Sequence, residues 1–128
     1  MTLLLDTHTF LWAILDDPAL SPAIRRRIES EADRVVVSAV CFWEIAIKFG
    51  LGKLELPEEP DRYLPAQRVA AGFEFLPIGE VEVCGVHRLP SHHRDPFDRL
   101  LVAQAHCYGF VIATDDPLIR RYSVRTAW

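Results

Sequence analysis

The chain has 128 residues, half of them hydrophobic and a quarter charged, which excludes a disordered chain and fits one domain over residues 1–128. Its 14 Lys and Arg residues and 18 Asp and Glu residues give a net charge of −4. This balance argues against a broad basic surface for binding duplex nucleic acid.

Three cysteines, Cys41, Cys84 and Cys107, lie far apart and include no C-x-x-C pair. We therefore expect buried free thiols in a reducing compartment. The first residues lack the basic start and long apolar run of a signal peptide, and no stretch approaches the length of a membrane span. A soluble, cytoplasmic protein is expected.

The first half of the chain alternates short apolar runs with helical patterns. Residues 3–5 and 35–37 are apolar runs typical of strands buried on both faces. Helices are predicted over residues 9–15, from the N-cap Ser21 and Pro22 onward, over about 40–49, and over 61–71.

The second half continues this alternation. Strands are predicted over residues 73–76 and 110–113, with a short helix over 81–87 and a strong helix from Asp95-Pro96 to Tyr108, which Gly109 ends. A helical turn follows from Pro117, and a fifth short strand is expected around Val124. This order predicts an α/β fold in three layers: a mainly parallel sheet of four to five strands with helices on both faces.

Acidic residues follow two of the predicted strands. Asp6 comes directly after residues 3–5, and Asp115 and Asp116 follow residues 110–113. Parallel sheets bind ligands beyond the carboxyl ends of their strands, so these positions suit metal ligands. Each has a structural alternative, because Asp6 can cap the next helix, Asp116 can cap the turn at Pro117, and Asp115 can be a solvated loop residue.

Other acids lie early in predicted helices. Glu44 shares an apolar helix face, where a charged side chain is rare unless it is paired or binds a metal. Lys48 has the spacing of an ion pair with Glu44, but we favour a functional role as a metal ligand. Asp95, followed by Pro96, is best interpreted as an N-cap. Asp98 lies in the first turn, where the helix dipole alone would favour an anion, and metal binding is equally consistent.

Strand ends and the starts of the following helices share one edge of such a sheet. Carboxylates gathered there would repel one another unless cations held them, and Mg²⁺ or Mn²⁺ are the ions that carboxylates favour. Such ions activate water and stabilise in-line displacement at phosphate. The side chains of Arg94 and Arg99 flank this region and are candidates for phosphate contact.

Four stretches resemble the PIN domain, and specifically the VapC-type toxin ribonucleases of toxin–antitoxin modules. They span nearly the whole chain: residues 3–8 (LLLDTH), 38–48 (SAVCFWEIAIK), 93–105 (HRDPFDRLLVAQA) and 114–117 (TDDP). The resemblance implies Mg²⁺-dependent cleavage of RNA by an activated water, a homodimer, and a cognate antitoxin that covers the site.

By this resemblance the catalytic, metal-binding acids are Asp6, Glu44, Asp98 and a fourth residue. The fourth is Asp116 if the pattern is Thr-x-Asp from Thr114, but Asp115 directly follows Thr114, so both stay open. Thr7 and Thr114 would then be supporting hydroxyls.

Other functions are less consistent with the residues. A phosphatase of the haloacid-dehalogenase type would need an acid two positions after Asp6, where this chain has His8. A receiver-like domain would need an Asp after a middle strand, where Ser38 and Leu76-Pro77 stand instead. The residues are also consistent with a non-enzymatic partner-binding module of the same fold.

Overall fold

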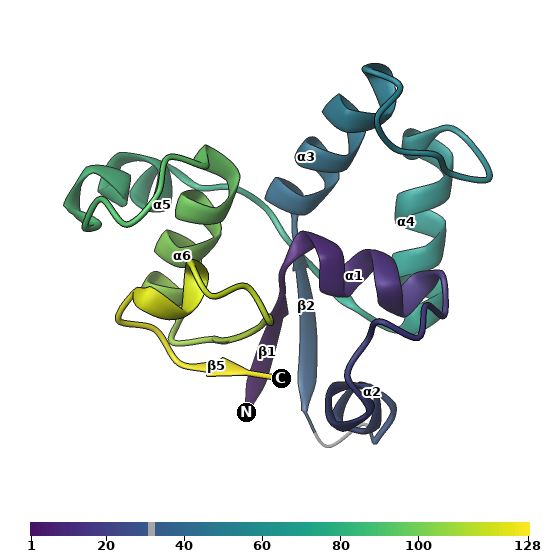
Figure 1. The fold of residues 1–128 in the computed structure, drawn as a ribbon, viewed down its shortest axis with the longest axis horizontal. Coiled ribbons are helices and arrows are strands. Elements are labelled where there is room, and N and C mark those ends of the chain that lie inside the picture. Colours follow the sequence, from purple (N-terminus) through teal and green to yellow (C-terminus); the bar gives the residue numbers. More distant parts are fainter. Residues whose placement is uncertain (31–32) are drawn as a thin grey trace.

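The computed structural model describes residues 1–30 and 33–128, and these form one five-stranded parallel sheet (Figure 1). The strand order is β3-β2-β1-β4-β5, and every pairing between neighbours is parallel. The central strand is apolar because both of its faces are covered. The strands are β1 (Thr2–Leu5), β2 (Arg34–Ser38), β3 (Glu74–Leu76), β4 (Val111–Ala113) and β5 (Thr126–Ala127).

Helices cover both faces of this sheet, with α1, α2 and α4 on one side and α5 and α6 on the other (Figure 1). The α/β prediction with three layers is therefore confirmed. The helices are α1 (Thr7–Ile14), α2 (Pro22–Glu29), α3 (Ala39–Gly50), α4 (Pro60–Ala71), α5 (Glu80–Gly85) and α6 (Pro96–Tyr108), with short 3₁₀ turns η1 (Val86–Arg88) and η2 (Ile119–Arg121).

Local capping signals set the helix ends. The hydroxyl of Ser21 accepts a hydrogen bond from the backbone N–H of Ile24 at the start of α2. Asp95 plays the same part for α6, and Gly109 ends that helix in the left-handed conformation, with φ of 70°. These positions match the predicted boundaries because capping depends on residues close in sequence.

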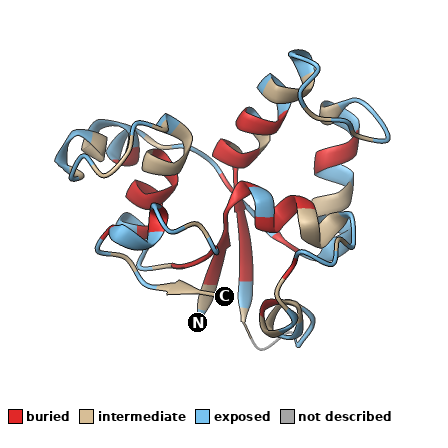
Figure 2. Ribbon diagram, viewed as in Figure 1, coloured by how far each residue is buried: buried red, intermediate tan, exposed pale blue. Residues whose placement is uncertain are grey.

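The buried residues concentrate where strands and helices meet (Figure 2). Leu3, Leu4 and Leu5 of β1 are fully buried, as are Ile45 of α3 and Val102 of α6. The first turns of α1 and α3 and the middle of α6 are thus held rigidly against the carboxyl edge of the sheet.

Two details of the sequence prediction are wrong. The fifth strand lies at Thr126–Ala127 rather than around Val124, because the N–H of Val124 closes a tight turn onto the carbonyl of Tyr122. The expectation of buried thiols holds for Cys41 alone, since Cys84 and Cys107 are exposed.

The two exposed thiols lie on α5 and in the last turn of α6. All three cysteines are free. No helix in the described part of the chain is long and apolar enough to cross a membrane.

Candidate active site

Asp6 joins the end of β1 to the start of α1. Its Oδ1 accepts a hydrogen bond from the backbone N–H of Thr9 at 2.9 Å, and its Oδ2 accepts one from the Thr114 hydroxyl at 2.5 Å. The side chain is buried, and burial raises the pKa of Asp6 above its ordinary value, although these hydrogen bonds oppose the rise. Asp6 is thus the helix cap that the sequence allowed, and it faces the sheet edge.

Glu44 lies in the second turn of α3 and is only 5% exposed. Its Oε1 accepts a hydrogen bond from the Thr7 hydroxyl, and its Oε2 pairs with Lys48 Nζ, both at 2.6 Å. The ion pair with Lys48 that the spacing allowed does form, and it leaves Glu44 buried rather than solvated. Because Thr7 follows Asp6, its bond to Glu44 connects the first turn of α1 to α3.

Asp95 and Asp98 open α6. Asp95 is the N-cap, because its Oδ1 accepts from the backbone N–H groups of Phe97 and Asp98 at 2.9 and 3.1 Å. Burial raises the pKa of Asp98 to about 7, with further contributions from the negative charges of Asp95, Asp116 and Glu44. Asp98 therefore lies near Asp95 of its own helix start and near acids from two other parts of the chain.

The loop after β4 places Asp115 and Asp116 differently. Asp116 donates its backbone N–H to the Thr114 hydroxyl at 3.0 Å, and its Oδ1 accepts from the N–H of Leu118 at 2.8 Å. The half-buried Asp116 contributes to the raised pKa of Asp98, whereas Asp115 is exposed. The loop thus turns Asp116 toward Asp98 and leaves Asp115 in solvent.

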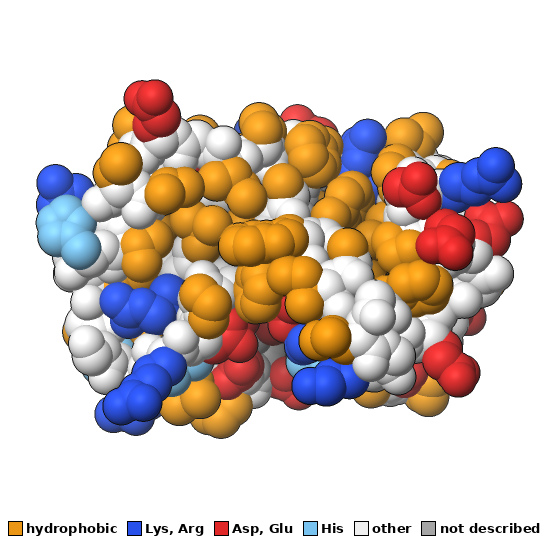
Figure 3. All heavy atoms as spheres, turned by 90° about the horizontal axis from the view of Figure 1, so that it is seen from above, with side chains coloured by type: hydrophobic (Ala, Val, Ile, Leu, Met, Phe, Trp, Pro, Cys, Tyr) orange, Lys and Arg blue, Asp and Glu red, His pale blue; other side chains and the backbone are white. Residues whose placement is uncertain are grey.

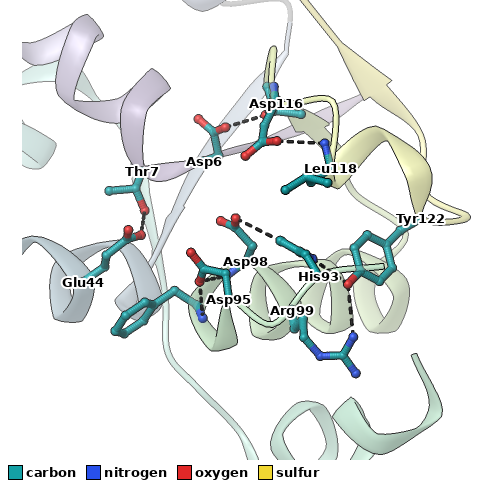
Figure 4. A network of polar contacts seen from close by, with 12 residues as sticks. Asp6, Thr7, Glu44, His93, Asp95, Asp98, Arg99, Asp116, Leu118 and Tyr122 are labelled. Carbon is teal, nitrogen blue, oxygen red and sulfur yellow. Dashed lines mark hydrogen bonds and ion pairs between the residues drawn. The ribbon is translucent and has the colours of Figure 1, made fainter. Parts of the chain in front are cut away.

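The carboxyl groups of Asp6, Asp98 and Asp116 face one shared space, and Glu44 lies at its side, bonded to Thr7 (Figure 4). The buried thiol of Cys41 lies close to this space as well. Burial, together with the charges of Asp6 and Glu44, raises the pKa of Cys41 to about 12, so it stays protonated. Residues from the ends of β1 and β4 and from α3 and α6 therefore converge.

Asp98 has a histidine partner that sequence reasoning missed. His93 Nε2 lies 3.2 Å from Asp98 Oδ2, and His93 Nδ1 lies 2.8 Å from the hydroxyl of Tyr122. Arg99 donates to the same hydroxyl at 3.1 Å (Figure 4). The sequence places His93 five residues before Asp98 and so allows their pairing. The contact with Tyr122 has no such signal, because Tyr122 is distant in the chain.

The two arginines expected to contact phosphate differ. Arg99 also donates to the carbonyls of Pro90, Val86 and Leu89, so its guanidinium holds the segment before α6. Phosphate contact by Arg99 would require it to give up these bonds. Arg94 is exposed and makes no hydrogen bond or ion pair with any residue that the structure describes.

The donor set fits a hard divalent cation in chemistry but not yet in geometry. Carboxylate oxygens are the ligands that Mg²⁺ and Mn²⁺ prefer, and a cation here would oppose the effect of burial and of neighbouring acids that raises the pKa of Asp98. Within residues 1–30 and 33–128, however, no three acid, imidazole or thiol groups form a ready-made ion site. Ion binding would require the carboxylates to come closer together than they lie here.

Comparison with known proteins identifies the family of the chain. Residues 3–124 match the family model of the PIN domain. The chain belongs to the PIN domain family. It is 30% identical over 122 residues to Ribonuclease VapC22 of Mycobacterium tuberculosis, covering 94% of this chain and 92% of that protein.

Solved structures share the PIN-domain fold. One is VapBC2 from Rickettsia felis bound to a promoter DNA fragment, with a TM-score of 0.74, 15% identity, and coverage of 99% of this chain and 98% of that one. Another is DNA-bound VapBC from Salmonella typhimurium, with a TM-score of 0.70, 19% identity, and coverage of 99% and 97%. At these identities the likeness establishes the fold alone.

Proposed function

We propose that this PIN-domain protein is a metal-dependent endoribonuclease and the toxin of a toxin–antitoxin module. The observation that carries the proposal is the convergence of Asp6, Glu44, Asp98 and Asp116 on one space at the carboxyl edge of the sheet. The 30% identity to Ribonuclease VapC22 across nearly the whole chain supports RNA as the substrate.

In this proposal Asp6, Glu44, Asp98 and Asp116 are the catalytic residues and hold Mg²⁺ or Mn²⁺. The bound cation would offset the carboxylate charges, lower the pKa of a bound water and stabilise charge on the phosphate. Asp115 is exposed and carries no role in the site.

Neighbouring groups orient these acids. Thr7 and Thr114 each hold one carboxylate oxygen, of Glu44 and Asp6 respectively, so the other lone pairs can face an ion. Asp95 fixes the first turn of α6 through its capping bonds, and that turn carries Asp98.

The surface around the acids suits a charged strand and a protein partner. Figure 3 shows Asp and Glu atoms gathered in a hollow beside an apolar band, with Lys and Arg atoms to either side. The exposed Arg94 precedes the N-cap of α6, so we assign it to contact with an RNA phosphate.

Exposed apolar side chains on or next to α3 include those of Trp43, Ile47 and Leu51. We assign this face to a cognate antitoxin that covers the acids, since relatives are found in VapBC complexes. A cytoplasmic homodimer belongs to the same proposal.

The test is RNA cleavage by purified, antitoxin-free protein with Mg²⁺ or Mn²⁺, and with a chelator. Asp6→Asn should abolish cleavage, whereas Asp61→Asn, a change at an exposed acid on α4, should not. Absence of cleavage by metal-replete wild-type protein would favour the partner-binding module. Hydrolysis of a small phosphate monoester in place of RNA would favour the phosphatase.

A further inference from the structure

A polar side chain, Gln104, lies in the buried middle of α6, about two helical turns from Asp98 at the start of the same helix. Gln104 is fully buried, while its neighbours Val102, Ala103 and Ala105 are apolar. A buried amide is costly unless each of its groups has a partner. Its position therefore calls for a specific explanation.

The Gln104 amide is satisfied at both ends. Its Oε1 accepts a hydrogen bond from the Ser38 hydroxyl at 2.5 Å, and its Nε2 donates to the carbonyl of Pro77 at 3.1 Å and to Glu82 Oε1 at 3.4 Å. A carbonyl and a carboxylate oxygen only accept, so they fix the amide orientation and turn Oε1 toward Ser38.

Ser38 uses its hydroxyl in two directions at once. It ends β2 and is the N-cap of α3, where its oxygen accepts from the backbone N–H of Val40 at 3.0 Å. Its proton is donated to Gln104. The start of α3 is thereby tied to the middle of α6 through the pair that we call the Ser38–Gln104 tie.

The Ser38–Gln104 tie lies the same number of residues from Glu44 as from Asp98. Glu44 follows Ser38 by six residues along α3, and Asp98 precedes Gln104 by six residues along α6. α3 leads away from the carboxyl edge of β2, and α6 runs back toward the start of the parallel strand β4. At about 1.5 Å per residue, each acid stands about 9 Å along its helix from the tie.

A second contact between the same helices supports this register. The rings of Trp43 and Phe97 meet edge to face, with centroids 4.8 Å apart. These residues directly precede Glu44 and Asp98. The helices thus meet at two levels, one at the tie and one beside the acids.

We propose that Gln104 and Ser38 are positioning residues for the acid site: their hydrogen bond sets the register of α3 against α6 and so places Glu44 opposite Asp98. This inference rests on the proposed function, because the acids are taken to hold a divalent cation. Neither residue touches the acids, so their effect passes through the two helices.

The test uses Gln104→Met, which keeps the side-chain length and removes the hydrogen bonds, together with Ser38→Ala and the double variant. Mn²⁺ affinity is measured by calorimetry, and kcat and KM are measured on RNA. Each single variant should bind Mn²⁺ about 10- to 100-fold more weakly, with lower kcat and little change in KM. The double variant should be no worse than the weaker single variant, because the tie is lost once.

The matched control is Ile24→Ala, which removes buried atoms on α2, far from both helices. It should lower the unfolding temperature and keep the Mn²⁺ affinity of the wild type. If Gln104→Met and Ser38→Ala also keep wild-type Mn²⁺ affinity and kcat, the tie only stabilises the fold and the inference is wrong.

A metal-free readout separates this inference from the proposed function. Crystal structures of wild type and Ser38→Ala without added metal should differ by a slide of α3 along α6 and a longer distance between the Glu44 and Asp98 carboxylates. An unchanged distance overturns the inference even if RNA is cleaved. A changed distance in a protein that cleaves no RNA would sustain the tie and reject the ribonuclease.

Discussion

A neutral side chain at position 98 should stabilise the metal-free protein. The charged form of Asp98 is disfavoured first by burial and then by the charges of Asp95, Asp116 and Glu44, which raise its pKa from 3.8 to about 7. Asp98→Asn keeps the shape of the side chain and removes the charge. The variant should therefore unfold at a higher temperature than the wild type while losing RNA cleavage.

The size of the effect follows from the pKa. Each pKa unit corresponds to about 1.4 kcal/mol, so a rise from 3.8 to about 7 sets an upper bound of roughly 4 kcal/mol. The side chain is 18% exposed, so solvent screens part of the interaction and we expect about half of this bound, roughly 2 kcal/mol. For a chain of this length that is about 8 °C in unfolding temperature.

The stability difference between Asp98→Asn and the wild type should depend on pH in a defined direction. Because the folded state holds the Asp98 proton more tightly than the unfolded state, the wild type loses stability as pH rises from about 4 to about 7. The advantage of Asp98→Asn should be absent below about pH 4 and complete above about pH 7. Added Mg²⁺ should stabilise the wild type more than the variant and so reduce the difference.

Thermal unfolding in a chelator, followed by circular dichroism over this pH range, measures the effect. Asp61→Asn is the matched control, since Asp61 also lies in the first turn of a helix but is exposed. Loss of its favourable interaction with the helix dipole should cost about 0.3–1 kcal/mol, the opposite sign. A metal-free Asp98→Asn protein that is less stable than wild type at about pH 8 would refute the reasoning.

Three further changes have defined outcomes. Thr114→Val removes the hydroxyl that donates to Asp6 Oδ2 and should lower kcat/KM about 10- to 100-fold in an RNA cleavage assay, with KM little changed. Lys48→Met removes the ammonium group that pairs with Glu44 Oε2. Mn²⁺ should then bind more tightly by calorimetry, while the metal-free protein should unfold at a lower temperature. Weaker Mn²⁺ binding would contradict this. Gly109→Ala places a Cβ at a φ of 70°, which strains the backbone, and should lower the free energy of unfolding by about 1 kcal/mol without changing RNA cleavage. An unchanged midpoint in denaturant unfolding would contradict this strain.

The sequence was most informative where the physical signal is local. Ser21 with Pro22, and Asp95 with Pro96, mark helix starts by residues that directly contact the first turn. The apolar run at β1 could be predicted as a central strand because burial on both faces leaves no place for polar residues. The fifth strand, only two residues long, has no such pattern, and its pairing with β4 depends on the turn before it.

The convergence of the acids could be predicted because strand ends and helix starts share one edge of a parallel sheet. The different exposure of Asp115 and Asp116 could not, since both follow the same strand. It depends on the Thr114 hydroxyl, which accepts a hydrogen bond from the backbone of Asp116 and shapes the loop. A one-residue difference in a loop carries no periodic signal.

Partners that depend on distant contacts were beyond sequence reasoning. Gln104 belongs to a helix pattern that predicts burial, but its bond to Ser38 joins residues 66 positions apart. Tyr122 reaches His93 across 29 positions. The exposure of Cys84 and Cys107 has the same origin, because the face that a helix buries depends on what packs against it.

The structural and functional interpretations of the acids turn out to be compatible. Asp6 caps α1 with Oδ1, and Glu44 pairs with Lys48, yet both lie at the shared space. A capping or pairing bond fixes one oxygen of a carboxylate and so holds the group in one orientation. A site whose ligands are fixed by such bonds loses little side-chain entropy when an ion arrives, and the repulsion around Asp98 is relieved at the same step. Acids that are costly to the metal-free fold are therefore the ones that should bind a cation most readily.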